Sequence, residues 1–166
     1  MFYAVGSLES YPCDLRRASK LSLVVNMPTT PDFGPRRTLL YIEDNPADLK
    51  LVEQIIARHP DIRLLTAVNG NSGIEIARES QPDVILMDIN LTDISGFKAL
   101  ITLRSDSTTT HIPVIALTIN AMPFNIESGL EAGFFRYLTK PIKINEFMDA
   151  LGVALELAGR QSAKSK

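Results

Sequence analysis

The stretch Asp83-Val84-Ile85-Leu86-Met87-Asp88 decides the fold of this chain. Its continuous apolar run predicts a strand buried on both faces, which is typical of parallel sheets covered by helices. Asp88 ends the run, so the buried strand would display this carboxylate at its carboxyl end. In an open parallel sheet, ligands bind outside the carboxyl ends of the strands, where residues distant in sequence become neighbours. Asp88 is therefore the first candidate for a functional residue.

Strands and helices are expected to alternate on both sides of this run. Four further short apolar runs predict strands at residues 38–42, 62–68, 113–118 and 134–138. Amphipathic patterns between the strands predict helices, of which the one around Ile126 and Leu130 is the weakest and ends at Gly133. A last helix carries Phe147 and Leu151 on its apolar face. The alternation predicts an α/β fold, a doubly wound (βα)5 sandwich with a five-stranded parallel sheet.

Acidic residues gather at two of these strand ends. Glu43 and Asp44 follow the strand at 38–42, and Asp88 ends the central strand. Two carboxylates about 4 Å apart repel by about 4 kcal/mol at an effective dielectric near 20, so the cluster requires a cation or raised pKa values. Mg²⁺ prefers oxygen ligands, as Mn²⁺ does, and the backbone carbonyl of Asn90 is a further candidate ligand. The sequence therefore predicts a Mg²⁺ or Mn²⁺ site.

A cation and a hydroxyl close the last two strands. Thr118 ends the strand at 113–118, and Lys140 precedes Pro141 after the strand at 134–138. A carboxylate beside a metal, a lysine and a threonine favours phosphoryl transfer, because a carboxylate can form an aspartyl phosphate. Asp88 would be the nucleophile, while Lys140 neutralises one phosphoryl oxygen and Thr118 donates a hydrogen bond to another.

Four motifs resemble the receiver domain of two-component response regulators. They are Tyr-Ile-Glu-Asp-Asn at 41–45, Leu-Met-Asp-Ile-Asn-Leu at 86–91 with Gly96, Ile-Ala-Leu-Thr at 115–118, and Tyr-Leu-Thr-Lys-Pro at 137–141. These motifs are most similar to those of receivers at the C-terminal end of hybrid sensor histidine kinases. The resemblance implies the flavodoxin-like receiver fold over 38–158. Residues 1–37 lack a sustained period and are rich in proline and glycine in their second half, which indicates a poorly ordered extension or linker. Residues 159–166 are expected to form a polar tail.

The resemblance also implies a reaction. Asp88 would accept a phosphoryl group from a phosphohistidine on a histidine kinase or phosphotransfer protein, and the chain would catalyse only its own phosphorylation and dephosphorylation. Mg²⁺ would be held by Asp44, Asp88 and the Asn90 carbonyl, with Glu43 acting largely through water. The Lys140-Pro141 peptide bond would be cis.

Signal output is a further implication of the family. Phosphorylation would draw Thr118 towards the phosphate and change the exposure of Tyr137, so these two residues would form the switch. For Tyr137, simple packing of a half-buried strand aromatic is an equal alternative. The output surface would comprise the fourth helix, the fifth strand and the fifth helix. An unidentified downstream protein, or a second copy in a homodimer, would bind there.

Two positions depart from the family pattern. Leu91-Thr92 stands where Met-Pro is common, so the loop loses the fixed φ of proline and is expected to be looser. Ile119 stands where a small residue is usual, and its branched side chain is expected to crowd the path to Asp88. We therefore expect small phosphoryl donors to react more slowly with this chain than with an Ile119→Ala variant.

Three other functions compete with this interpretation. A haloacid-dehalogenase-type phosphohydrolase would need an acid two residues after the nucleophile, where this chain has Asn90. A flavin-binding module would need a phosphate-binding loop after the first strand, where Glu43 and Asp44 would repel the phosphate. A receiver-shaped interaction domain that works without phosphorylation would typically lack one of the acids or Lys140, and all are present.

The charge balance and the apolar stretches of the chain limit the classes of partner that it is expected to bind. The 166 residues include 17 Lys and Arg against 19 Asp and Glu, so the chain lacks the positive field that drives nucleic-acid binding. The early apolar stretch 21–27 is much shorter than the roughly 20 residues of a membrane span. Residues 1–20 lack the basic start and continuous apolar centre of a signal peptide. We expect a cytoplasmic protein that binds neither nucleic acid nor membrane.

Overall fold

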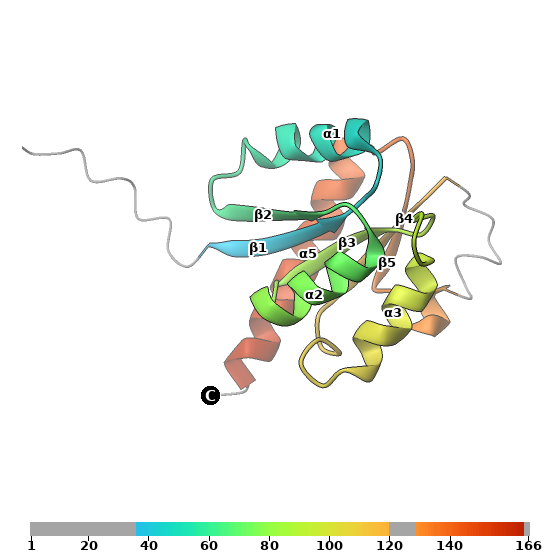
Figure 1. The fold of residues 1–166 in the computed structure, drawn as a ribbon. Coiled ribbons are helices and arrows are strands. Elements are labelled where there is room, and N and C mark those ends of the chain that lie inside the picture. The colour runs from blue at the N-terminus through green and yellow to red at the C-terminus, as the bar shows by residue number, and fades with distance from the viewer. Residues whose placement is uncertain (1–35, 120–128, 165–166) are drawn as a thin grey trace, which may run out of the picture. The chain divides into compact units, whose positions relative to one another are not determined.

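The structure is a computed structural model, and it describes residues 36–119 and 129–164. The first half contains β1 (Arg37–Ile42), α1 (Pro46–Ile56), β2 (Ile62–Ala67), α2 (Gly70–Ser80) and β3 (Val84–Asp88). The second half contains α3 (Gly96–Ser105), β4 (Val114–Thr118), β5 (Arg136–Thr139) and α5 (Ile144–Lys164) (Figure 1). All strand pairs are parallel, in the order β2-β1-β3-β4-β5. The predicted doubly wound α/β fold is confirmed.

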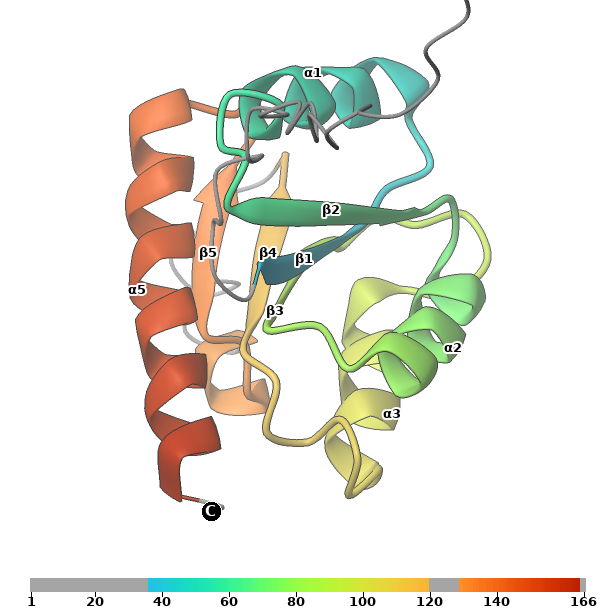
Figure 2. The ribbon, with the colours of Figure 1, turned by 90° about the vertical axis from the view of Figure 1, so that its left-hand side faces the viewer.

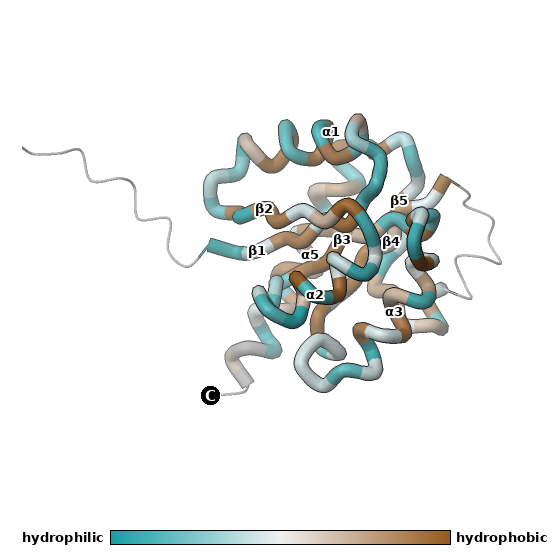
Figure 3. The backbone as a smooth tube through the Cα atoms, viewed as in Figure 1, coloured by the Kyte–Doolittle hydropathy of each residue, from teal (hydrophilic) through white to brown (hydrophobic). Residues whose placement is uncertain are grey.

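Helices cover both faces of this sheet. Helices α1 and α5 lie on one side, and α2 and α3 lie on the other (Figure 2). The side chains of β1 alternate between the two sides, since Leu39 and Tyr41 pack with α1 and α5 while Leu40 and Ile42 pack with α2 and α3. All five residues of β3 are buried, as expected for a central strand. In Figure 3 the central strands are accordingly largely brown, the colour of hydrophobic residues.

Two helix predictions have different outcomes. Most of the weak helix around Ile126 lies outside the described residues, but residues 129–132 are helical and end at Gly133, whose φ of 109° favours glycine. The predicted polar tail at 159–166 is wrong for residues 159–164, because α5 continues to Lys164. No proline interrupts this segment, and Ala158 is still buried, so the polar residues lie on a helix rather than in a tail.

Strand boundaries differ slightly from the predicted ones. β1 begins at Arg37, β2 ends at Ala67, β4 begins at Val114, and β5 covers Arg136–Thr139 instead of 134–138. The peptide bond between Lys140 and Pro141 is cis. Of the expected extension at 1–37, the structure describes the last two residues, and no described helix has the length and hydropathy of a membrane span.

The strand register brings the predicted site residues to one edge of the sheet. Ile42 pairs with Met87, so Glu43 and Asp44 emerge beside Asp88. Asp88 pairs with Leu117, one residue before Thr118. The backbone N–H of Lys140 donates to the carbonyl of Thr118 at 2.8 Å, which fixes the lysine next to the end of β4. Four strand ends therefore converge as the sequence predicted.

Candidate functional site

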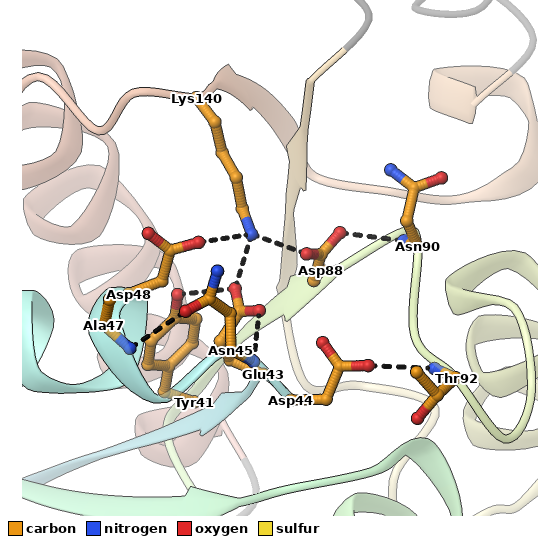
Figure 4. A network of polar contacts seen from close by, with 10 residues as sticks. All are labelled: Tyr41, Glu43, Asp44, Asn45, Ala47, Asp48, Asp88, Asn90, Thr92 and Lys140. Carbon is orange, nitrogen blue, oxygen red and sulfur yellow. Dashed lines mark hydrogen bonds and ion pairs between the residues drawn. The ribbon is translucent and has the colours of Figure 1, made fainter.

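Lys140 is the centre of a network of carboxylates. Its ammonium donates to Asp88 Oδ2 at 2.5 Å, to Glu43 Oε2 at 2.7 Å and to Asp48 Oδ2 at 2.8 Å (Figure 4). These three bonds use all three donors of the ammonium group. Burial alone would lower the pKa of Lys140, but the bonds to Asp48, Asp88 and Glu43 outweigh burial and raise it. The lysine is therefore a fixed positive charge at the end of β3.

Glu43 is the most deeply buried acid of the network, with no exposed surface. Burial raises its pKa, against the effect of hydrogen bonds from Lys140, the backbone N–H of Asn45 and the hydroxyl of Tyr41. The Asn45 N–H donates to Oε1 at 3.1 Å, and the Tyr41 hydroxyl donates to Oε2 at 2.9 Å. Burial and the nearby Glu43 also raise the pKa of Tyr41, which keeps its hydroxyl protonated as a donor.

Asp88 is 5% exposed and is held at both oxygens. Oδ2 accepts from Lys140, and Oδ1 accepts the backbone N–H of Asn90 at 2.7 Å. Gly96 lies directly behind it, since a Cβ there would lie 2.7 Å from the Asp88 carbonyl oxygen and from Ile89 Cα. Only a residue without Cβ allows α3 to begin so close to the candidate nucleophile.

Three acids form a candidate metal site. Glu43, Asp44 and Asp88 each present a carboxylate oxygen, and these oxygens lie within 4.8 Å of one another. Asp44 is held from the other side, because its Oδ2 accepts the backbone N–H of Thr92 at 3.1 Å. Carboxylate oxygens suit Mg²⁺ and Mn²⁺ better than softer metals, so the donor set fits the predicted ion. Asn90 lies beside Asp88 and is exposed (Figure 4).

Thr118 and Tyr137 occupy different surroundings. Thr118 is 5% exposed at the end of β4, next to the strand that ends in Asp88. Tyr137 packs its ring edge-on against Phe134, with centroids 5.3 Å apart, and its hydroxyl is buried without a hydrogen-bond partner among the described residues. A Cβ at Gly129 would lie 1.6 Å from that hydroxyl oxygen, so the tyrosine points onto the backbone of Gly129. Burial raises the pKa of Tyr137.

Two residues of the network were absent from the sequence prediction. Asp48 lies in the first turn of α1, where an acid is usual because it favours the helix dipole, so its type gave no functional signal. Tyr41 belongs to the apolar run that predicted the strand at 38–42; it is fully buried, but its hydroxyl reaches Glu43. Ile119 is 74% exposed. This exposure does not test whether Ile119 crowds the path to Asp88, so the slower reaction with small donors stays a prediction.

Comparison with known proteins places this geometry in a family. The family model of the response regulator receiver domain matches residues 39–152. A polar-differentiation response regulator, DivK of Brucella anthropi, is 35% identical over 115 residues, which cover 69% of this chain and 93% of the relative. The DivK protein of Brucella ovis is 34% identical over 115 residues, with the same coverage of this chain and of the relative.

Solved structures agree with these sequence relatives. The receiver domain of a sensor histidine kinase from Pseudomonas aeruginosa, which has a magnesium ion coordinated in its active-site cleft, is 30% identical. It aligns with a TM-score of 0.65 over 75% of this chain and 98% of that chain. The chemotaxis response regulator CheY4 of Vibrio cholerae shares the fold, with a TM-score of 0.67, 22% identity, and coverage of 72% and 99%. By sequence and by fold, the chain belongs to the family of response regulator receiver domains.

Proposed function

We propose that this receiver accepts a phosphoryl group from a phosphohistidine donor onto Asp88 in a reaction that depends on Mg²⁺ or Mn²⁺. The donor would be a histidine kinase or a histidine phosphotransfer protein. The observation that carries the proposal is the bond between Lys140 Nζ and Asp88 Oδ2 inside a cluster of three further carboxylates. The Lys140 ammonium beside Asp88 is placed to neutralise negative charge on a phosphoryl group that the Asp88 carboxylate would accept.

In the proposed step, an oxygen of Asp88 attacks the phosphorus of the phosphohistidine. The new P–O bond forms as the P–N bond breaks, and the bonding electrons leave on the imidazole nitrogen. Lys140, which already donates to Asp88, would stay within reach of a phosphoryl oxygen and neutralise its charge. The bound cation would supply further neutralisation of the phosphoryl oxygens. It would be held by Asp44, Asp88 and the Asn90 carbonyl, with Glu43 acting largely through water.

The output of this receiver would follow from the new charge on Asp88. The hydroxyl of Thr118, at the end of the adjacent strand, would donate to the phosphoryl group and bias the segment that follows it. Tyr137 would change its exposure in response. A downstream protein, or a second copy of the chain, would then bind the surface formed by the fourth helix, β5 and α5. We place the reaction in the cytoplasm and treat the chain as a phosphoacceptor, not an enzyme acting on other substrates.

Intact mass spectrometry under acidic conditions tests the acceptor. Wild type, Asp88→Asn and the control Asp106→Asn are incubated with a small phosphoryl donor, with Mg²⁺ or with EDTA. Asp106 is a suitable control because it caps the far end of α3. We expect wild type and the control to gain one phosphoryl group with Mg²⁺ alone, and Asp88→Asn to gain none.

Two results would contradict the proposal. An equal gain in Asp88→Asn would move the acceptor to another residue. If neither the small donor nor a phosphohistidine protein modifies wild type, the chain is an interaction domain that works without phosphorylation.

A further inference from the structure

The loop between β3 and α3, residues 89–95, borders the candidate metal site on one side. It contains Asn90, whose N–H donates to Asp88, and Thr92, whose N–H donates to Asp44. Thr92 lacks the ring that would fix φ in a proline, and it has the N–H that a proline would lack. This chain therefore holds the loop by other contacts.

Asp93 makes the most extensive of these contacts. Its Oδ1 accepts the backbone N–H of Gly70 at 2.8 Å, and its Oδ2 accepts both the backbone N–H and the side-chain amide of Asn71 at 2.9 Å. Gly70 and Asn71 begin α2, where helical N–H groups lack partners within the helix and favour a negative charge. Slight burial would raise the pKa of Asp93, but these N–H donors lower it, so the carboxylate is ionised at neutral pH.

A second contact joins the loop to α2 at the same place. A Cβ at Gly70 would lie 2.5 Å from Ile94 Cγ1, so the side chain of Ile94 packs directly on the start of the helix. Helix α2 also has a cap of its own, because the side chain of Asn69 accepts the N–H of Ser72 at 2.8 Å. Asn69 thus satisfies the N–H of Ser72 locally, whereas Asp93 binds the N–H groups of Gly70 and Asn71 and so fixes the loop against α2.

We propose that Asp93 is a positioning residue for the metal site, which holds the 89–95 loop against α2 and so places the Asn90 carbonyl and the Thr92 N–H that orients Asp44. Asp93 contacts neither the metal nor the phosphoryl group in this arrangement. It acts through the 89–95 loop. Asn90 and Thr92 of this loop donate to the acids of the site, while Asp93 accepts from the start of α2. The inference rests on the proposed function, because it concerns the affinity of the proposed metal site.

Binding of Mn²⁺ to the full chain tests this role without any phosphoryl transfer. Electron paramagnetic resonance of free Mn²⁺ gives the dissociation constant for wild type, Asp93→Asn and Asn69→Ala. Asn69→Ala is the matched control, since it weakens the same end of α2 without touching the loop. Groups that orient a metal ligand typically change affinity by 10-fold or more, so we expect Asp93→Asn to weaken Mn²⁺ binding about 10-fold. Asn69→Ala should keep the wild-type affinity while losing thermal stability.

Hydrogen exchange of the metal-free protein supplies a second measurement. The amides of Asn90 and Thr92 should exchange faster in Asp93→Asn than in wild type, and at the wild-type rate in Asn69→Ala. If Asp93→Asn does not fold, Asp93→Glu keeps the charge on a longer side chain, and an intermediate loss of affinity is expected.

The outcomes separate the inference from the proposed function. If wild type binds Mn²⁺ and Asp93→Asn binds it equally well, the positioning role is wrong and the metal site stands. If Asn69→Ala weakens binding as much as Asp93→Asn, the effect comes from α2 stability and the positioning role is again wrong. If wild type and the variants all fail to bind Mn²⁺, the proposed metal site fails and the inference fails with it.

Discussion

Replacement of Lys140 by methionine should destabilise the metal-free protein and make its stability depend on Mg²⁺. The ammonium bonds Glu43, which is fully buried, and Asp88, whose side chain is 7% exposed. Loss of one partner from a buried ion pair costs about 3–5 kcal/mol, because the remaining charges are uncompensated. Asp48 is 29% exposed, so its share is small. Partial protonation of Glu43 also reduces the repulsion between the remaining carboxylates. We therefore expect the free energy of unfolding to fall by about 3 kcal/mol, the lower end of this range.

A bound cation should replace much of the lost charge. A ligand at 100 times its dissociation constant stabilises the folded state by about 2.7 kcal/mol, which is close to the expected loss. Removal of the competing ammonium should also tighten Mg²⁺ binding, since the three carboxylates of the candidate site then face the ion without Lys140. Mg²⁺ should therefore stabilise Lys140→Met more than it stabilises wild type.

The destabilisation should also depend on pH. Burial raises the pKa of Glu43 above its ordinary value of 4.5, against hydrogen bonds from Lys140 and others. A carboxyl with a raised folded pKa favours folding at low pH, and this contribution is lost as pH rises through the folded pKa. Without Lys140 the pKa should rise further. The stability loss of Lys140→Met should therefore be smaller at pH 5 than at pH 8.

Urea unfolding followed by circular dichroism, in EDTA and in Mg²⁺, measures these effects. Lys143→Met is the matched control, because Lys143 is 65% exposed and its pair with Glu146 is worth less than about 1 kcal/mol. The reasoning is refuted if Lys140→Met in EDTA loses no more stability than the control. It is also refuted if Mg²⁺ stabilises Lys140→Met no more than wild type.

Three further variants test other parts of the structure. Gly129→Ala should displace Tyr137 and bring the raised pKa of its phenol back towards 10. Ultraviolet absorbance during a pH titration measures this pKa, and an unchanged titration would mean that Tyr137 does not point onto Gly129. Hydrogen bonds from Thr108 lower the pKa of Asp106 to about 2, so its stabilising charge is lost as pH falls from about 4 through 2. The urea midpoint of Asp106→Asn should consequently fall less over this range than that of wild type, and parallel curves would contradict the assignment. Ile119→Ala should be phosphorylated faster by small donors than wild type, and equal initial rates would show that the exposed Ile119 does not obstruct Asp88.

Local sequence patterns determined the elements of this fold. The apolar run before Asp88 predicted a buried central strand. Asn45-Pro46 has the residue types typical of a helix start, and in α1 the Asn45 side chain accepts the N–H of Ala47. These features depend on periodicity and on side-chain bonds over a few residues. They also determined which acids stand at strand ends. The acids at the strand ends could therefore be predicted before their geometry was known, whereas Asp48 and Tyr41 could not.

Tertiary structure decided which polar groups meet. Lys140 bonds Asp48 across 92 positions and Asp88 across 52, and the carboxylate of Asp93 reaches the start of α2 across 23 positions. An acid in a first helical turn or a loop has the same local pattern whether or not it has such a partner. The partner depends on strand order, register and helix placement, which the chain acquires only when the whole sheet assembles. The sequence by itself thus determined the elements and the acids at their ends, whereas packing across the sheet decided that Asp48 would hold the lysine and Asp93 the loop.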